Sequence, residues 1–138
     1  MRHSKGVLDT SAVLRLHELS EEDVPTEAAI SAITLAELSV GPLVTDDEEE
    51  RAARLAQVQH ANADYGDPLP FGEEAARAFA QVAADIRRSG SKSKARAFDA
   101  LIAATAKAAG LPLYTFNAHD LAGVTGLELV SLPPTRDS

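Results

Sequence analysis

Apolar and polar residues alternate along the chain in blocks that predict short strands separated by helices. The apolar run Gly6-Val7-Leu8 ends at Asp9 and predicts a buried strand over 5–8. Apolar residues at helical spacing then follow over 11–19. A second strand is expected over 28–33, and a short helix over 34–40 ends at a Gly-Pro pair.

The rest of the chain repeats this alternation. Helices are expected over 45–63, opened by the capping-box pattern Thr45-x-x-Glu48, over 73–88 and over 95–109. Strands are expected over 69–71, 113–116 and 127–132. Strands that alternate with helices predict an α/β protein, a single α/β/α sandwich around a central, mainly parallel sheet. One domain over 1–133 is expected, followed by a short polar tail over 134–138.

The amino-acid composition narrows the possible classes of protein. The 138 residues are 45% hydrophobic and 25% charged, as in ordinary globular domains. Cysteine is absent, which excludes disulfides, thiolate nucleophiles and Cys-ligated zinc. No apolar run approaches the roughly 18 residues of a membrane span, and the N-terminus lacks a signal-peptide core, so a cytoplasmic protein is expected. The G-x-S-x-G, P-loop and G-x-G-x-x-G motifs are also missing.

The net charge of −8 argues against a passive coat for nucleic acids. Its distribution is uneven. Residues 46–50 are all acidic and are interpreted as a solvated helix start, whereas residues 87–107 carry six cations and only one acid, Asp99. A local basic strip can hold a polyanion, and Lys92, Lys94 and Arg96 are the candidates; a solvated loop explains them equally well.

Several acids stand in unusual settings. Asp9 follows the first strand, Glu37 lies in an apolar helix, Asp99 opens another apolar helix, and Asn117 and Asp120 follow the strand over 113–116. Each taken alone has a simple structural explanation as a cap, a turn residue or a surface charge. Together they place carboxylates where ligands bind at the carboxyl edge of a parallel sheet. Oxygen ligands without cysteine or paired histidine favour Mg²⁺ or Mn²⁺, ions that support in-line phosphoryl chemistry.

Four short motifs in this order resemble the PIN domain family, and in particular the VapC toxins of bacterial toxin–antitoxin pairs. The motifs are Val7-Leu8-Asp9-Thr10-Ser11, Thr34-Leu35-Ala36-Glu37-Leu38, Phe98-Asp99-Ala100-Leu101-Ile102-Ala103-Ala104 and Leu113-Tyr114-Thr115-Phe116-Asn117-x-x-Asp120-Leu121. The resemblance implies a PIN-like sandwich and a Mg²⁺-dependent endoribonuclease that uses metal-activated water.

The resemblance also implies roles for individual residues. Asp9, Glu37 and Asp99 match the core metal-binding acids. Asn117 matches the fourth position, and Asp120 is a neighbouring acid that can replace its charge. Thr10 and Thr115 would support the site by hydrogen bonding. Relatives often carry a basic residue where Phe116 stands.

The implied partners are an RNA substrate and a cognate antitoxin that lays a basic side chain into the acidic site, in a toxin–antitoxin complex, with a homodimer as the family's habit. One alternative is a catalytically silent PIN-like module that binds RNA or protein, which the neutral Asn117 allows. A phosphoacceptor or Asp-nucleophile phosphatase fits less well, because Ser11 stands where the phosphatase motif needs a second Asp.

Overall fold

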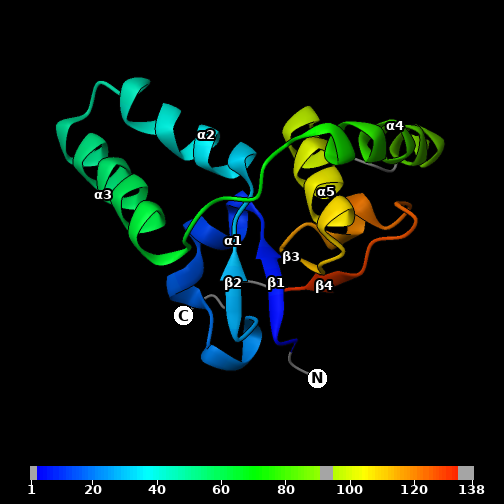
Figure 1. Cartoon of the computed structure of the whole chain (residues 1–138). Coiled ribbons are helices and arrows are strands. Elements are labelled where there is room, and N and C mark those ends of the chain that lie inside the picture. Colours follow the sequence, from blue (N-terminus) through cyan, green and yellow to red (C-terminus); the bar gives the residue numbers. More distant parts are fainter. Residues whose placement is uncertain (1–2, 91–94, 134–138) are drawn as a thin grey trace.

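A four-stranded parallel sheet forms the centre of the computed structural model, which describes residues 3–90 and 95–133 (Figure 1). The strands are β1 (Lys5–Leu8), β2 (Glu27–Ala29), β3 (Leu113–Thr115) and β4 (Leu129–Ser131). Their order in the sheet is β2-β1-β3-β4, and every neighbouring pair is parallel. The expected α/β class with a parallel sheet is confirmed.

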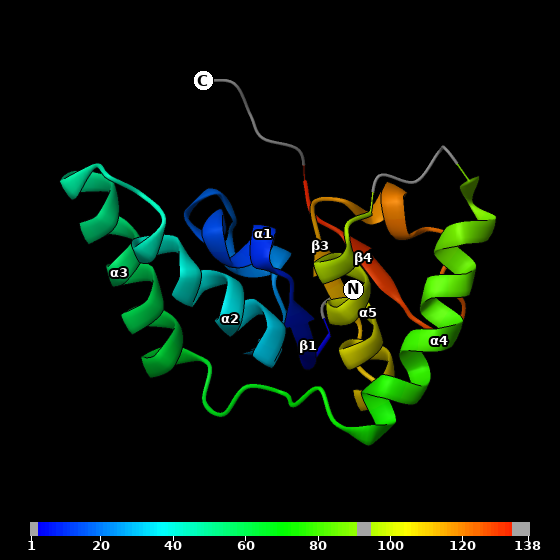
Figure 2. The ribbon, with the colours of Figure 1, turned by 90° about the horizontal axis from the view of Figure 1, so that it is seen from above.

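In the described part of the chain, five α-helices flank the sheet. They form two groups, as the view from above shows (Figure 2). They are α1 (Thr10–Leu14), α2 (Ala32–Val40), α3 (Glu48–Asp64), α4 (Glu73–Arg88) and α5 (Ala97–Ala109). One core cluster joins the sheet to α4 and α5, and the other joins it to α1, α2 and α3. The chain is therefore the α/β/α sandwich that the alternation of elements predicted.

Side-chain alternation along the strands assigns residues to the two cores. Val7 and Leu113 face the α4–α5 layer, whereas Leu8 and Tyr114 face the α1–α3 layer. Gly6 lies against the Tyr114 ring so closely that a Cβ atom there would stand 2.6 Å from Tyr114 Cε1. The absence of a side chain at this position lets the ring cover the strand.

Some predicted boundaries are wrong for local reasons. The helix expected over 11–19 is divided into α1 and a 3₁₀ turn, Leu16–Glu18. The strand expected over 28–33 stops at Ala29, because Ser31 caps α2 and its Oγ accepts a 3.0 Å hydrogen bond from Thr34 N.

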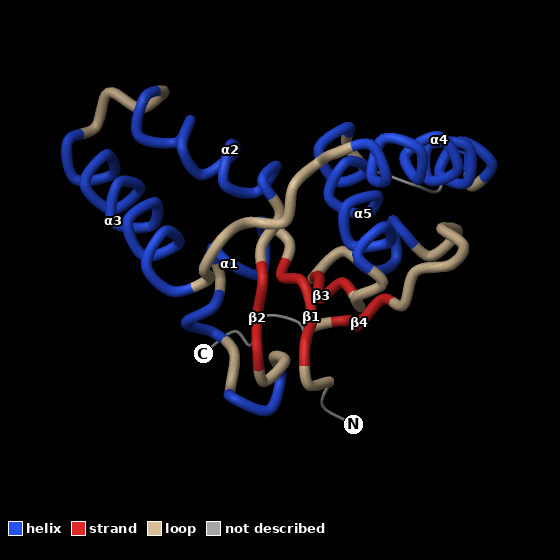
Figure 3. The backbone as a smooth tube through the Cα atoms, in the orientation of Figure 1, coloured by secondary structure: helices blue, strands red, loops and turns tan. Residues whose placement is uncertain are grey.

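Other boundaries shift less. Asp47 rather than Thr45 caps α3. The strand expected over 69–71 is reduced to a single bridge between Leu69 and Ser31. The tube view shows how short the strands are relative to the loops that leave them (Figure 3). The expected tail 134–138 lies outside the described residues, and no helix within them is long and apolar enough to cross a membrane.

Asp85 fixes the loop that precedes β4 to the end of α4. Its carboxylate accepts 2.9 Å hydrogen bonds from the backbone N–H and the hydroxyl of Thr125 and from the Gln81 amide, and it pairs with Arg88. These interactions lower the pKa of Asp85 to about 2, with the Thr125 backbone hydrogen bond as the largest cause. The loop after β3 is thus anchored at its far end.

Candidate functional site

Asp9 occupies the point where β1 ends and α1 begins, at the carboxyl edge of the sheet. The residue is only 6% exposed. Oδ1 accepts hydrogen bonds from Ala12 N at 2.8 Å and from Ser11 Oγ at 2.7 Å, so Asp9 caps α1. The cap explains why the carboxylate is held rigidly, and its burial makes it a candidate for chemistry as well.

The remaining surroundings of Asp9 come from the other half of the chain. Burial raises the pKa of the Asp9 carboxyl, hydrogen bonds from Thr115, Ala12 and Ser11 lower it, and the negative charge of Asp99 raises it. Thr115 is fully buried at the end of β3. The fold therefore places two carboxylates, ninety positions apart in the sequence, within electrostatic reach of each other.

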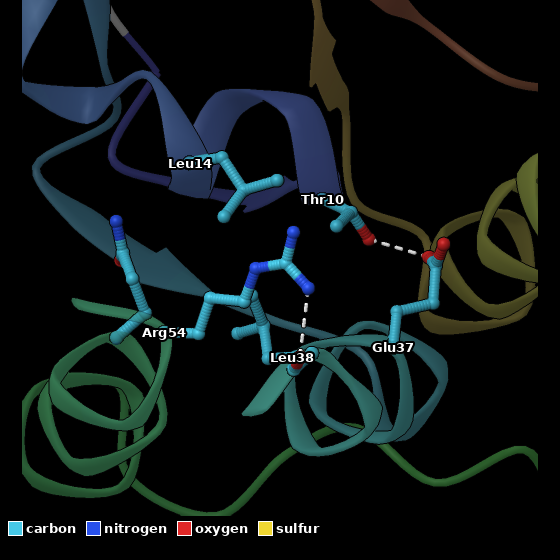
Figure 4. Close-up of a pocket in the computed structure, with 7 residues that line it drawn as sticks. Thr10, Leu14, Glu37, Leu38 and Arg54 are labelled. Carbon is cyan, nitrogen blue, oxygen red and sulfur yellow. Dashed lines mark hydrogen bonds between the residues drawn. The ribbon is translucent and has the colours of Figure 1, made fainter. Parts of the chain in front are cut away.

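Glu37 is held at the same edge by a chain of hydroxyl groups. Its Oε1 accepts a 2.6 Å hydrogen bond from Thr10 Oγ1, and Thr10 Oγ1 lies 3.1 Å from Thr34 Oγ1 (Figure 4). Since the single Thr10 proton points to the carboxylate, Thr34 must donate to Thr10. Thr34 and Ser31 are fully buried, with their hydroxyl oxygens 3.3 Å apart. The chain of hydroxyls thus ends on Glu37.

Asn117 and Asp120 lie beyond β3. Asn117 directly precedes the 3₁₀ turn Ala118–Leu121, and Asp120 lies within it. The Asn117 side chain is exposed, and its backbone N–H donates a 2.9 Å hydrogen bond to Thr115 Oγ1. Asp120 is partly buried, and its backbone N–H donates to Asn117 O at 3.0 Å. Thr115 therefore links this turn to Asp9, while the choice between Asn117 and Asp120 at the fourth position stays a prediction.

Asp99 stands in the first turn of α5, where Oδ2 accepts a 3.0 Å hydrogen bond from Arg96 N. Arg96 is exposed directly before that helix. Lys92 and Lys94 lie outside the described residues, so the predicted basic strip is located only at Arg96. This cation stands three positions from one of the paired acids.

The donor set fits Mg²⁺ in chemistry, although it does not form a preformed cage. In the part of the chain that the structure describes, no three His, Cys, Asp or Glu side chains are grouped closely enough to hold a metal ion. Asp9 and Asp99 lie within electrostatic reach of each other, and Glu37 accepts a hydrogen bond from Thr10. Mg²⁺ commonly keeps several waters and uses only one or two protein carboxylates, which this pair supplies.

Two features of the site escaped the sequence analysis. Ser31 and Thr34 begin the hydroxyl chain, and the capping pattern Ser-x-x-Thr before an apolar helix was the signal that could have identified Ser31. Phe116 packs under the Arg15 guanidinium, whose carbon lies 3.7 Å from the ring centroid. A cation thus lies over the Phe116 ring, and no local sequence pattern predicted this contact.

The chain is similar to known proteins over most of its length. The PIN domain family model matches residues 6–124. Ribonuclease VapC5 of Mycobacterium tuberculosis is 35% identical over 130 residues, covering 92% of this chain and 93% of that protein. Ribonuclease VapC1 of Rickettsia felis is 29% identical over 130 residues, covering 91% and 95%.

A solved structure agrees with these matches. The crystal structure of VapBC-5 from Mycobacterium tuberculosis, a member of the VapBC family of toxin–antitoxin systems, contains a chain with a TM-score of 0.81 and 34% identity. The alignment covers 94% of this chain and 99% of that one. The chain therefore belongs to the PIN domain family, in its VapC group.

Proposed function

We propose that this protein is a Mg²⁺-dependent endoribonuclease, the toxin of a toxin–antitoxin pair, which hydrolyses RNA phosphodiester bonds. The observation that carries the proposal is the buried Asp9 carboxylate at the carboxyl edge of the sheet, within electrostatic reach of Asp99. Two carboxylates within electrostatic reach repel each other, and a bound divalent cation relieves the repulsion. The ribonuclease names of the relatives support the choice of RNA as substrate.

The position of each residue indicates its proposed role. Asp9 and Asp99 would hold the metal ion, with Glu37 and Asp120 as further carboxylates at the same edge. When bound, Mg²⁺ supplies an activated water and charge stabilisation for an in-line displacement. Thr115 orients Asp9, and Thr10 orients Glu37. Asp9 and Glu37 are thus held before RNA arrives, which reduces reorganisation during the reaction.

The same edge suits a protein inhibitor. The solved relative is a complex of a toxin–antitoxin system. A cognate antitoxin that places an Arg or Lys between Asp9 and Asp99 would neutralise the pair much as a cation does. We therefore expect a toxin–antitoxin complex, and the homodimer stays a prediction.

Cleavage of pooled tRNA and rRNA tests the proposal. The purified, antitoxin-free chain is incubated with Mg²⁺ or Mn²⁺, beside an EDTA control and the Asp99→Asn variant. Wild type should cut, whereas both controls should be silent because either the ion or one of its two ligands is missing. The cut sites would then identify the target class.

Two other outcomes contradict the proposal. Cleavage that survives Asp99→Asn would show that a different site, or a contaminant, is responsible. If the folded, metal-loaded protein binds RNA and cuts none of it, the silent PIN-like binding module becomes the better description.

A further inference from the structure

A pocket between α1, α2 and α3 opens beside Glu37. Its volume is about 270 Å³. Thr10 and Glu37 form one end, Leu14 and Leu38 are apolar walls, and Arg54 reaches into the middle from α3 (Figure 4). The pocket is thus continuous with the edge that carries the candidate acids, yet none of the roles assigned above uses Arg54.

The α3 wall of this pocket consists of hydrogen-bond donors. Arg54 donates to Gly41 O at 2.8 Å and pairs with Glu50, which occupies two of its five N–H groups. Three N–H groups have no protein partner among residues 3–90 and 95–133. Gln57, one turn further along α3, lines the same pocket, and its amide has no hydrogen-bond partner within the described chain. These donors can bind a ligand rich in hydrogen-bond acceptors.

We propose that this pocket is a subsite for a backbone phosphate of the RNA substrate, with Arg54 and Gln57 as its ligands; this assignment rests on the proposed ribonuclease function. Arginine and glutamine are both among the side chains that bind nucleic-acid phosphates. A hydrogen bond between the Arg54 guanidinium and a phosphate oxygen is charge-assisted on both sides and is stronger than one between neutral groups. Glu37 is at the opposite end, so the phosphate lies against the α3 wall.

Charge separates this ligand from the main alternative. At the α3 wall a basic antitoxin side chain would be repelled by the guanidinium of Arg54, whereas Glu37 at the opposite end would attract it. A phosphodiester is attracted to the guanidinium and is present at every step of an RNA strand. A strand whose scissile phosphate lies near Asp9 and Asp99 can place a neighbouring phosphate in this pocket.

Binding of pooled tRNA to the cleavage-deficient Asp99→Asn protein tests the subsite. Dissociation constants are measured between about 50 and 200 mM KCl, which also gives the number of phosphate contacts. Arg54→Met should weaken binding about 10-fold and reduce the salt slope by about one. Gln57→Glu, which adds a negative charge to the pocket and breaks no contact within the described chain, should weaken binding about 10-fold as well.

Two matched variants control for folding and net charge. Arg51→Met removes a guanidinium one turn earlier on α3, where it bonds to Thr45 O and Pro42 O rather than lining the pocket. Gln59→Glu adds the same charge on an exposed position of that helix. Both should bind RNA as the Asp99→Asn parent does.

The controls also separate the two proposals. If Arg54→Met matches Arg51→Met, and Gln57→Glu matches Gln59→Glu, the phosphate subsite is refuted and a protein partner becomes the better occupant. If Arg54→Met fails to fold, the Gln57→Glu comparison alone decides. Loss of wild-type cleavage would refute the ribonuclease function without changing these binding differences.

Discussion

Replacing Thr10 with valine removes one hydroxyl from the chain that ends on Glu37 while keeping the size of the side chain. The Thr10 hydroxyl donates the 2.6 Å hydrogen bond to Glu37 Oε1 and accepts from Thr34, 3.1 Å away. Valine provides neither function. Glu37 would lose its fixed orientation, and the buried Thr34 hydroxyl would lose its acceptor.

The structure sets the size of the effect. A hydrogen bond to a charged group contributes about 1.5–3 kcal/mol, and the lower end applies because Glu37 is partly exposed and water can replace Thr10. Thr34 can turn its proton toward Ser31 Oγ, 3.3 Å away, so the loss of Thr10 as an acceptor costs little free energy. We therefore expect the free energy of unfolding to fall by about 1–2 kcal/mol. The rate of RNA cleavage should fall about 10-fold at saturating RNA, if Glu37 must be oriented.

Urea unfolding and cleavage of pooled tRNA measure the two effects, and Thr10→Ser is the matched control. Serine retains the hydroxyl and loses only a methyl group, which costs about 0.8 kcal/mol at most. Thr10→Ser should therefore cleave RNA nearly as fast as wild type, although its stability is slightly lower. Equal cleavage by the Val and Ser variants would refute the idea that the hydroxyl chain positions Glu37.

Three further substitutions test the site and the scaffold. Asp9→Asn should abolish cleavage yet stabilise the protein at pH 7. Because the pKa of Asp9 is raised in the folded state, wild type gains stability as the pH falls through that pKa toward 3.8. Urea midpoints at pH 7 and pH 4 should show this gain for wild type and not for the Asn variant. Asp85→Asn should lower the melting temperature at pH 7. Because the folded-state pKa of Asp85 is about 2, the stabilisation by its carboxylate is present above the unfolded value near 3.8 and is lost as the pH falls toward 2. The melting temperatures of wild type and variant should therefore converge near pH 2. Gly6→Ala should cost about 1–3 kcal/mol in urea unfolding, since the new methyl group must displace the Tyr114 ring; an unchanged midpoint would contradict the close packing.

The sequence predicted the elements whose patterns are local. Strand β1 and helix α4 were found at their observed bounds, because an apolar run that ends at Asp9 and an apolar stripe over 73–88 depend only on nearby residues. The pattern failed where a single cap decided the boundary. Ser31 ends β2 and starts α2, although the residues around it are apolar enough to extend a strand.

The same distinction between local pattern and long-range packing applies to the candidate site. The sequence by itself singled out Asp9, Glu37 and Asp99, because acids at a strand end and in apolar helices are chemically conspicuous. The parallel pairing of β1 with β3 joins segments far apart in the chain. This long-range pairing brings Asp9 within electrostatic reach of Asp99.

Only the tertiary structure revealed the groups without a conspicuous pattern. Arg54 reads as one more cation on a charged helix, and Gln57 as an ordinary surface amide. Packing of α3 beside α1 and α2 turns both side chains toward the pocket next to Glu37. Helical periodicity fixes which residues share a face, but the neighbour that this face meets depends on long-range packing, which no local pattern contains.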